Sequence, residues 1–423
     1  MHATSRGSTT WTVKTLACGH VARAGDKLVC AHLTGSAEQP LEVHFALTGS
    51  GVDYDVLCGD CAGAANPREE LVQACEGCVD RADDWGALIR WIGEPEVWHA
   101  DRRMPAVTET AGAIQPVNEH CIAPLHDGWL VHTGTELAEV NEAGVVRRLP
   151  APELAAPAAE QAWVHSPRPV LHTSPNGRFA AVCIDYGTTG AVVDLVSGEV
   201  VLPLEREDYH AYTVPYPFAF VAQDEVVVGT AWNRLEVFAL PSGRRRAADP
   251  GDAALDYFHG RLTANPSGTL VLDDGWVWHP VGIPMVVDVA ALPVPLEAKK
   301  HGTEMVWREW WDDPVAWVDD RTLVLSGIGG GESRKLPGVL VFDTKTGRRT
   351  AMFAGPDGRI WAAGGLLYVR SEAGLERWDP ATGTRTGVVA GFHPATHNPA
   401  TGLFAEITGG VLRTWRDELP AGD

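Results

Sequence analysis

One short sequence motif, called the phrase below, recurs seven times along the chain and limits the folds that the chain can adopt. Each copy is one or two turn residues followed by four to six apolar residues, and the copies start at Gly128, Gly177, Asp224, Gly268, Arg321, Gly365 and Gly402. Short apolar runs bounded by turn residues are typical of buried strands. Successive copies lie about 37 to about 53 residues apart, which is the period expected for the blades of a β-propeller.

A second apolar run that ends in a polar turn follows many of these copies. The turns are Ser-Gly, Thr-Gly or Ala-Gly pairs, which mark hairpins, at Gly144, Gly198, Gly243, Gly347 and Gly383. In repeat period and turn chemistry, the last three quarters of the chain resembles WD40-like and YVTN-like seven-bladed β-propellers, and Trp378-Asp379 is its best match to the Trp-Asp signature of WD40 repeats. The resemblance implies an all-β fold, with a seven-bladed propeller over residues 96–423.

The ring is predicted to be closed by a strand from outside the repeats. Only eight residues follow Trp415, too few for a further outer strand. A propeller blade cannot bury both of its faces alone, so the blades stack in a closed ring. We therefore expect a segment near Val97–Val117 to pair in the last blade.

Residues 1–95 are predicted to form a small zinc-binding α+β domain. Six of the eight cysteines precede residue 80, and with two histidines they form four close pairs: Cys18 and His20, Cys30 and His32, Cys58 and Cys61, Cys75 and Cys78. Zinc takes four sulfur or nitrogen ligands, and a close pair supplies two of them from one tight turn. Free thiols or a redox pair are the alternatives, but two Cys-x-x-Cys pairs favour bound zinc.

The number of zinc ions and the pairing of their ligands stay open. The two Cys-x-x-Cys pairs have nearly the spacing of a four-cysteine site, which gives one zinc. The two Cys-x-His pairs lie on expected strands, Leu16–Val21 and Lys27–Leu33, and would hold a second zinc or interleave with the other pairs. Residues 16–80 are similar in outline to RING and related double-zinc modules. Because those modules order their pairs differently, ligase activity does not follow from the resemblance.

A helix is predicted to end this domain. Its apolar residues recur at i, i+3, i+4 and i+7, which places them on one face: Trp85, Leu88, Ile89 and Ile92. Asp83 or Asp84 would cap its start, and Gly93 would follow its end.

The charge and the apolar pattern restrict the partners and the compartment. Fifty-five acidic and 34 basic residues give a net charge of −21, which opposes binding to nucleic acid. The first residues lack the apolar core of a signal peptide, and no apolar run is long enough to span a membrane, so we expect a cytoplasmic protein. The high content of Ala, Gly, Arg and Trp suggests a bacterium with a GC-rich genome.

Function is predicted only in outline. No linear catalytic motif is present, which favours a non-enzymatic scaffold whose propeller binds a protein or peptide. The alternative is an enzyme, either a hydrolase or lyase at the propeller channel or a ligase-like factor that recruits a partner through the zinc module. Tyr209–Phe220 is an aromatic-rich loop, and the four tryptophans of Met305–Trp317 are expected mainly in the core. Cys121 and Cys183 are expected to be inert core thiols.

Overall fold

The structure, a computed structural model, describes most of the chain after residue 97 and parts of the chain before it. The described residues are 27–30, 33, 42–48, 53–58, 61, 71–74, 88–92, 97–112, 114–154, 165–222, 224–246, 257–278, 281–292, 302–306, 308, 310–328 and 335–418. The chain divides into two compact units, Met1–Val97 with Gly329–Leu336, and Trp98–Ile328 with Pro337–Asp423. Among the described residues, no helix is long and apolar enough to cross a membrane.

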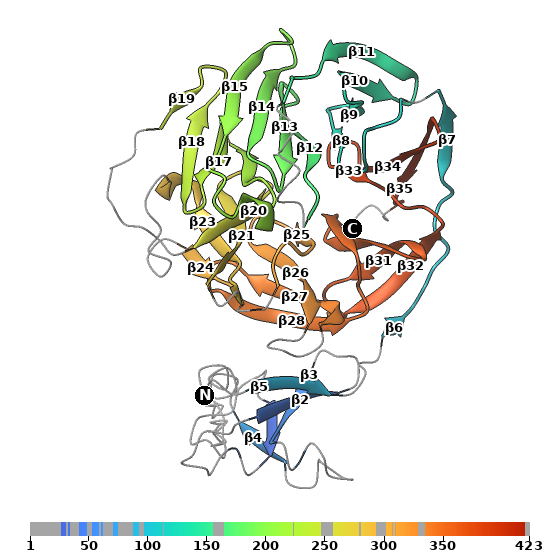
Figure 1. Cartoon of the computed structure of the whole chain (residues 1–423). Coiled ribbons are helices and arrows are strands. Elements are labelled where there is room, and N and C mark those ends of the chain that lie inside the picture. Colours follow the sequence, from blue (N-terminus) through green and yellow to red (C-terminus); the bar gives the residue numbers. More distant parts are fainter. Residues whose placement is uncertain are drawn as a thin grey trace, which may run out of the picture. The chain divides into compact units, whose positions relative to one another are not determined.

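The second unit is a seven-bladed β-propeller, as predicted (Figure 1). In blades 1 to 6 the strands follow one another in sequence from the inner edge of the ring outward, and neighbouring strands are hydrogen-bonded. Blade 1 contains β8 (Ile122–Pro124), β9 (Trp129–His132), β10 (Glu136–Asn141) and β11 (Gly144–Pro150). Blade 2 contains β12 (Arg168–Thr173), β13 (Phe179–Asp185), β14 (Thr189–Asp194) and β15 (Val200–Glu205). Blade 3 contains β16 (Phe218–Val221), β17 (Glu225–Ala231), β18 (Arg234–Ala239) and β19 (Arg244–Arg245).

Blades 4 to 7 continue the same order. Blade 4 contains β20 (Phe258–Ala264), β21 (Leu270–Val277), β23 (Met285–Asp288) and β24 (Gly302–Glu304), with β22 (Val281–Gly282) paired to β21. Blade 5 contains β25 (Val315–Trp317), β26 (Thr322–Ile328), β27 (Leu336–Asp343) and β28 (Arg348–Ala354). Blade 6 contains β29 (Arg359–Ala363), β30 (Leu366–Ser371), β31 (Gly374–Asp379) and β32 (Thr384–Ala390). Blade 7 begins with β33 (Thr396–Asn398), β34 (Leu403–Thr408) and β35 (Val411–Arg416).

The seven recurring phrases are the second strands of the seven blades. These strands are β9, β13, β17, β21, β26, β30 and β34. Each lies between two other strands and is covered by neighbouring blades, so at least half of its residues are buried; every residue of β13 is buried, and three of the six residues of β30 are. A strand covered on both faces requires a continuous apolar run, which is why the phrase is visible in the sequence.

The core consists of apolar layers between neighbouring blades. Phe179 and Val192 of blade 2 pack with Phe218 and Val226 of blade 3 in one such layer. Trp129 of blade 1 lies in another layer with blade 7 residues such as Leu412, so the first and last blades also share a core.

Blade 7 is completed by a strand from before the repeats, as predicted. Strand β7 (Thr108–Ala111) pairs antiparallel with β35, with Ala111 opposite Val411 and Thr108 opposite Thr414. Strand β6 (Trp98–His99) pairs parallel with the outer strand β32 of blade 6. The chain therefore closes the ring by joining its last repeat to a segment that precedes its first.

In the first unit, the described strands form a mixed five-stranded sheet in the order β4-β1-β3-β2-β5. The strands are β1 (Lys27–Cys30), β2 (Glu42–Thr48), β3 (Asp53–Cys58), β4 (Leu71–Ala74) and β5 (Leu88–Ile92). The predicted strand Lys27–Leu33 is confirmed at Lys27–Cys30, whereas Leu16–Val21 lies outside the described residues.

The helix predicted around Trp85–Ile92 is wrong, because its second half is strand β5, which pairs in parallel with β2. Leu88–Ile92 is a short apolar run interrupted only by Arg90, and such a run fits a strand as well as a helix. Ile and Trp favour strands, and pairing with β2 decides between the two.

Candidate functional site

The predicted zinc ligands fall in the first unit, where few of them are described. Cys58 is the last residue of β3, and both Cys58 and Cys61 are half-buried. Cys30 ends strand β1, and of this residue only the backbone is described. The remaining ligands lie outside the described residues: Cys18, His20, His32, Cys75 and Cys78. Within the part of the chain that is described, no three His, Cys, Asp or Glu groups are arranged to hold a metal ion.

The register of the sheet shows which of the predicted zinc ligands lie at the same end of neighbouring strands. Strands β1 and β3 are parallel, with Val29 opposite Val56, so Cys30 and Cys58 end their strands at the same edge of the sheet. Strand β4 runs the other way, and its last residue, Ala74, lies opposite Lys27 at the start of β1.

The two remaining cysteines are core thiols, as predicted. Cys121 and Cys183 are both fully buried. Cys121 Sγ lies 3.6 Å from His132 Nδ1. Burial nevertheless raises the pKa of the Cys121 thiol to about 12, so this cysteine–histidine pair does not supply a thiolate at neutral pH.

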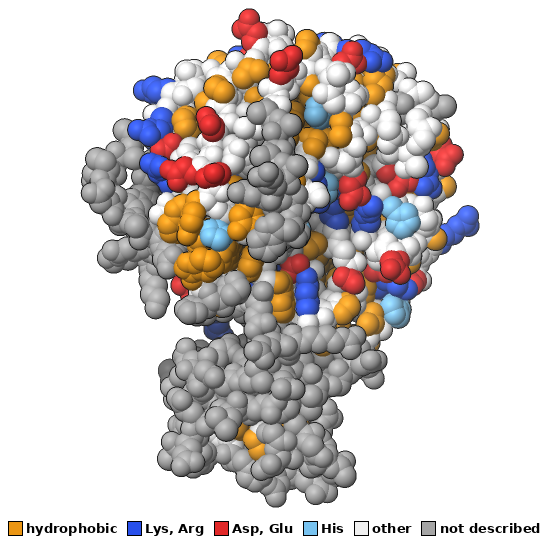
Figure 2. All heavy atoms as spheres, in the orientation of Figure 1, with side chains coloured by type: hydrophobic (Ala, Val, Ile, Leu, Met, Phe, Trp, Pro, Cys, Tyr) orange, Lys and Arg blue, Asp and Glu red, His pale blue; other side chains and the backbone are white. Residues whose placement is uncertain are grey.

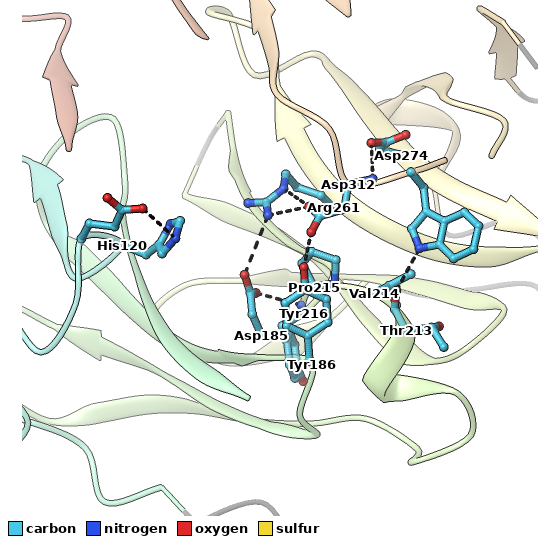
Figure 3. Close-up of polar contacts among 12 residues, drawn as sticks. His120, Asp185, Tyr186, Thr213, Val214, Pro215, Tyr216, Arg261, Asp274 and Asp312 are labelled. Carbon is cyan, nitrogen blue, oxygen red and sulfur yellow. Dashed lines mark hydrogen bonds and ion pairs between the residues drawn. The ribbon is translucent and has the colours of Figure 1, made fainter. Parts of the chain in front are cut away.

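One face of the propeller, which we call the loop face, carries a network of charged side chains from blades 2 and 4 and from one loop (Figure 3). The loop precedes β25 and includes Asp312, whose carboxylate accepts hydrogen bonds from Tyr186 Oη of blade 2 and from Arg261 Nε of blade 4. Arg261 Nη2 also lies 4.0 Å from Asp185 Oδ2. The Asp185 carboxylate accepts a 3.0 Å hydrogen bond from the backbone N–H of Tyr216, which leads into blade 3.

The network is mostly buried, with side chains 3% exposed at Asp185, 13% at Asp312 and 30% at Arg261, and this changes its electrostatics. Burial raises the pKa of Asp185, although Arg261 opposes the shift. Burial lowers the pKa of Arg261, but Asp312 and Asp185 outweigh it, and the guanidinium pKa rises above its usual value. Burial, and then the neighbouring Asp312, raise the pKa of Tyr186, so its hydroxyl stays a donor. The group is therefore a fixed set of ion pairs that holds its loops in one arrangement.

The backbone in this region adopts an uncommon conformation. Four described residues other than glycine have positive φ, and three of them lie here: Tyr186 at 59°, His210 at 54° and Asp312 at 60°. This left-handed conformation is costly for residues with a Cβ and persists where surrounding contacts fix it. Such residues gather at binding sites more often than elsewhere.

An aromatic patch lies beside the charged network. It consists of Tyr209, His210, Trp232, Phe258, Trp276, Trp278 and Trp311. Trp276 is the centre of a stack: its ring lies 4.1 Å from Phe258 at an interplanar angle of 10°, and 5.0 Å from Trp311 at 13°. Figure 2 shows apolar side chains gathered around a histidine on this face. Tyr209 is 49% exposed and Trp278 is 47% exposed.

The patch joins the two aromatic segments that the sequence singled out separately. Tyr209 and His210 belong to the loop before blade 3, and Trp311 belongs to the segment Met305–Trp317. The core prediction holds for Trp317, which is 8% exposed, but Trp311 is only partly buried and supports the surface.

The inner strands of the propeller enclose a cavity of about 760 Å³. It is lined by residues of all seven inner strands, including His172 of β12, Arg359 of β29 and His397 of β33. His172 Nε2 and His397 Nε2 are buried and have no hydrogen-bond partner among the described residues. Burial lowers the pKa of both imidazoles to about 4, with Arg261 adding to the shift of His172, so both are neutral at pH 7.

No protein-family model and no curated protein matches this sequence. Among solved structures, the fold is similar to a chain of the structure described as "Crystal Structure of Mitotic Checkpoint Complex". The TM-score is 0.48 and the sequence identity is 12%, with 77% of this chain and 96% of that chain covered.

Proposed function

We propose that the protein is a non-enzymatic, WD40-like scaffold of the bacterial cytoplasm that binds a protein or peptide partner through the aromatic patch of its propeller. The observation that carries this proposal is the pair of half-exposed rings, Tyr209 and Trp278, beside a stacked aromatic support. Tyrosine and tryptophan supply much of the binding energy in protein interfaces, because each buries a large area with few rotatable bonds.

The loop that carries Tyr209 is held rigidly, which favours binding. Arg206 is buried and donates hydrogen bonds to the carbonyl oxygens of Gly187, Ala211, Val214 and Pro215, at 2.7, 2.8, 3.1 and 3.2 Å. Trp311 Nε1 donates to the carbonyl oxygen of Thr213 at 2.9 Å. A surface ordered before binding loses little conformational entropy when a partner docks.

The acidic and histidine side chains of the loop face do not favour the enzyme alternative. Asp312 and Asp185 are held by Arg261, and His259 is bound to Asp273, with side chains 2% and 0% exposed. A general base must reach the proton that it removes, and these groups are already engaged or out of reach.

Site-specific photo-crosslinking tests the proposed binding surface. With a photoreactive benzoylphenylalanine at position 278, we expect one partner to be crosslinked reproducibly in cells, and the additional Tyr209→Ala substitution to reduce the yield several-fold. The same probe at Val196, a valine of blade 2 that is 76% exposed, is the matched control. Equal crosslinking at positions 278 and 196, or no effect of Tyr209→Ala, would refute a partner at the patch.

The N-terminal unit is proposed to bind zinc as a structural ion, with interleaved ligand pairs. The support is the register of the sheet: Cys30 and Cys58 end adjacent parallel strands at one edge, and Cys61 follows Cys58 closely. We therefore assign Cys30, Cys58 and Cys61 to one ion. His32 is proposed as its fourth ligand because it follows Cys30 by only two residues. The remaining four residues, Cys18, His20, Cys75 and Cys78, would hold the second ion.

Metal content measured by native mass spectrometry tests this pairing. We expect two zinc ions in the wild-type protein and one in each of Cys30→Ser and Cys61→Ser. If these cysteines share an ion, the double variant also keeps one zinc. Sequential pairing instead predicts that the double variant loses both ions, and a wild-type protein without metal would contradict the zinc proposal altogether.

A further inference from the structure

We propose that the propeller channel binds a small polyanion, a phosphorylated or multiply carboxylated metabolite, between the guanidinium groups of Arg168 and Arg359. This site is separate from the aromatic patch and does not depend on the proposed scaffold function. Figure 2 shows Lys and Arg side chains near the middle of the propeller face, within a protein whose net charge is −21.

The arginines come from inner strands of different blades and converge on the channel. Arg168 begins β12 of blade 2, Arg261 lies in β20 of blade 4, and Arg359 begins β29 of blade 6. The Arg168 guanidinium lies over the Tyr186 ring, 5.5 Å from its centre, and Tyr186 bonds the same carboxylate, that of Asp312, as Arg261 does. Arg168 is therefore beside the charged network that contains Arg261.

The carboxylates of the region pair with other arginines. Asp312 is held by Arg261, as Figure 3 shows, and Glu119 is held by Arg370 of β30. Neither Arg168 nor Arg359 has a carboxylate within ion-pair distance in the described part of the chain. Arg261 faces both Asp312 and Asp185, so the four arginines Arg168, Arg261, Arg359 and Arg370 meet three carboxylates and one positive charge is unmatched.

Both unpaired guanidinium groups contain a buried donor. Arg168 Nε and Arg359 Nη1 are buried and lack a hydrogen-bond acceptor among the described residues. Buried N–H donors of charged groups are almost always bonded, because an unmet donor costs free energy. Burial, and then the like charges of Arg261 and Arg370, lower the pKa of Arg359 to about 10, with Glu119 opposing them. A phosphate or carboxylate would satisfy these donors and relieve the repulsion.

The channel has room for such a ligand beside Arg359, although Arg168 is not among the residues that line this cavity. Arg359 and His172 both line the cavity of about 760 Å³, a size within the ordinary range for small-molecule sites. His172 lies four residues after Arg168 on β12, so both side chains leave the same side of that strand, roughly 13 Å apart along it, and a ligand in the cavity would extend along β12 toward Arg168. The acidic surface would repel a large polyanion such as nucleic acid, whereas a small anion can enter the channel.

Differential scanning fluorimetry of the full chain tests the site. We expect pyrophosphate to raise the melting temperature of the wild-type protein by at least roughly 2 °C above sodium chloride of equal ionic strength. Inorganic phosphate and citrate distinguish the two ligand classes. A larger shift with the phosphates would assign a phosphorylated ligand, and a larger shift with citrate a carboxylated one.

Substitution of the unpaired arginines distinguishes binding from structural roles. Without added anion, Arg359→Gln and Arg168→Gln are expected to melt at or above the wild-type temperature, because like-charge repulsion is relieved, and both should lose the anion shift. The matched control is Arg385→Gln in the same blade as Arg359. Arg385 pairs with Asp101 and Glu376, so its variant should melt lower and keep the shift. A wild-type shift no larger than that in chloride, or variants that melt lower and keep the shift, would overturn the proposal.

Discussion

Replacing residues 104–112 with glycine and serine is expected to open the propeller ring and to lower the free energy of unfolding by at least about 4 kcal/mol. The segment contains β7, the strand that completes blade 7 by pairing with β35. Met104 and Val107 pack against the cluster that contains Tyr368, Phe404 and Trp415. Each lost backbone hydrogen bond costs about 1 kcal/mol net, and exposure of the two apolar side chains adds a few kcal/mol.

The matched control is the same replacement of residues 98–102, which contain β6. This strand pairs with β32 at only two positions, at the outer edge of blade 6, and both of its side chains are exposed. The segment also contains the backbone N–H groups of Ala100 and Arg102, which bond to β32, and the Asp101 carboxylate that pairs with Arg385, so we expect this variant to lose about 2 kcal/mol or less. Urea unfolding followed by tryptophan fluorescence measures both variants. If both replacements lower the free energy of unfolding by similar amounts, the pairing of β7 with β35 does not contribute specially to the stability of the propeller.

The fold was predictable because its signal is local. Each blade buries its second strand on both faces, so strands such as β13 and β17 require apolar runs bounded by turns. The closing strand, Thr108–Ala111, has no apolar pattern of its own. It was predictable only because the last repeat has too few residues for an outer strand, so that strand had to come from another part of the chain. The helix expected near Leu88–Ile92 failed because its pairing with β2, about 45 residues earlier in the chain, is invisible to local periodicity.

The charged network was not predictable, because its members come from separate blades. Asp185, Arg261 and Asp312 are single residues in different repeats, and no spacing relates them. A weaker signal was present. Arg261 lies within an inner strand, and Asp273 and Asp274 interrupt the apolar phrase of β21. A charged residue inside an otherwise buried strand must be paired or functional, although the sequence alone cannot identify its partner.

The largest single-residue effect is expected at the ion pair between Arg308 and Asp274. Arg308 Nη2 lies 2.7 Å from Asp274 Oδ1, and the two side chains are only 3% and 1% exposed. The other carboxylate oxygen of Asp274 accepts the backbone N–H of Asp312 at 2.9 Å, so the pair also positions the loop that carries Trp311. Arg308→Met leaves a carboxylate buried without its guanidinium, and we expect a loss of about 3–5 kcal/mol in unfolding free energy.

Two further variants make this prediction specific. Adding Asp274→Asn to Arg308→Met removes the more deeply buried of the two carboxylates that Arg308 faces, the other being Asp313 at 3.8 Å, and keeps an acceptor for the backbone N–H of Asp312. The double variant is therefore expected to regain at least about 1 kcal/mol. Arg148→Met breaks an ion pair of 2.6 Å whose side chains are 52% and 39% exposed, and it should cost about 1 kcal/mol at most. Chemical unfolding at fixed pH compares the three variants. A double variant less stable than Arg308→Met would contradict the explanation that an unpaired buried carboxylate causes the loss of stability.

The pH dependence of the Arg308→Met variant tests the same cause independently. Burial raises the pKa of Asp274 and Arg308 opposes the shift, so removing the guanidinium raises the pKa further. A carboxyl group with a raised folded-state pKa binds its proton more tightly in the folded state than in the unfolded state. Stability therefore falls as the pH rises through that pKa. The deficit of Arg308→Met relative to the wild type should accordingly be larger at pH 7 than at pH 4. An equal deficit at both values would assign the loss to packing around Arg308, rather than to the buried charge of Asp274.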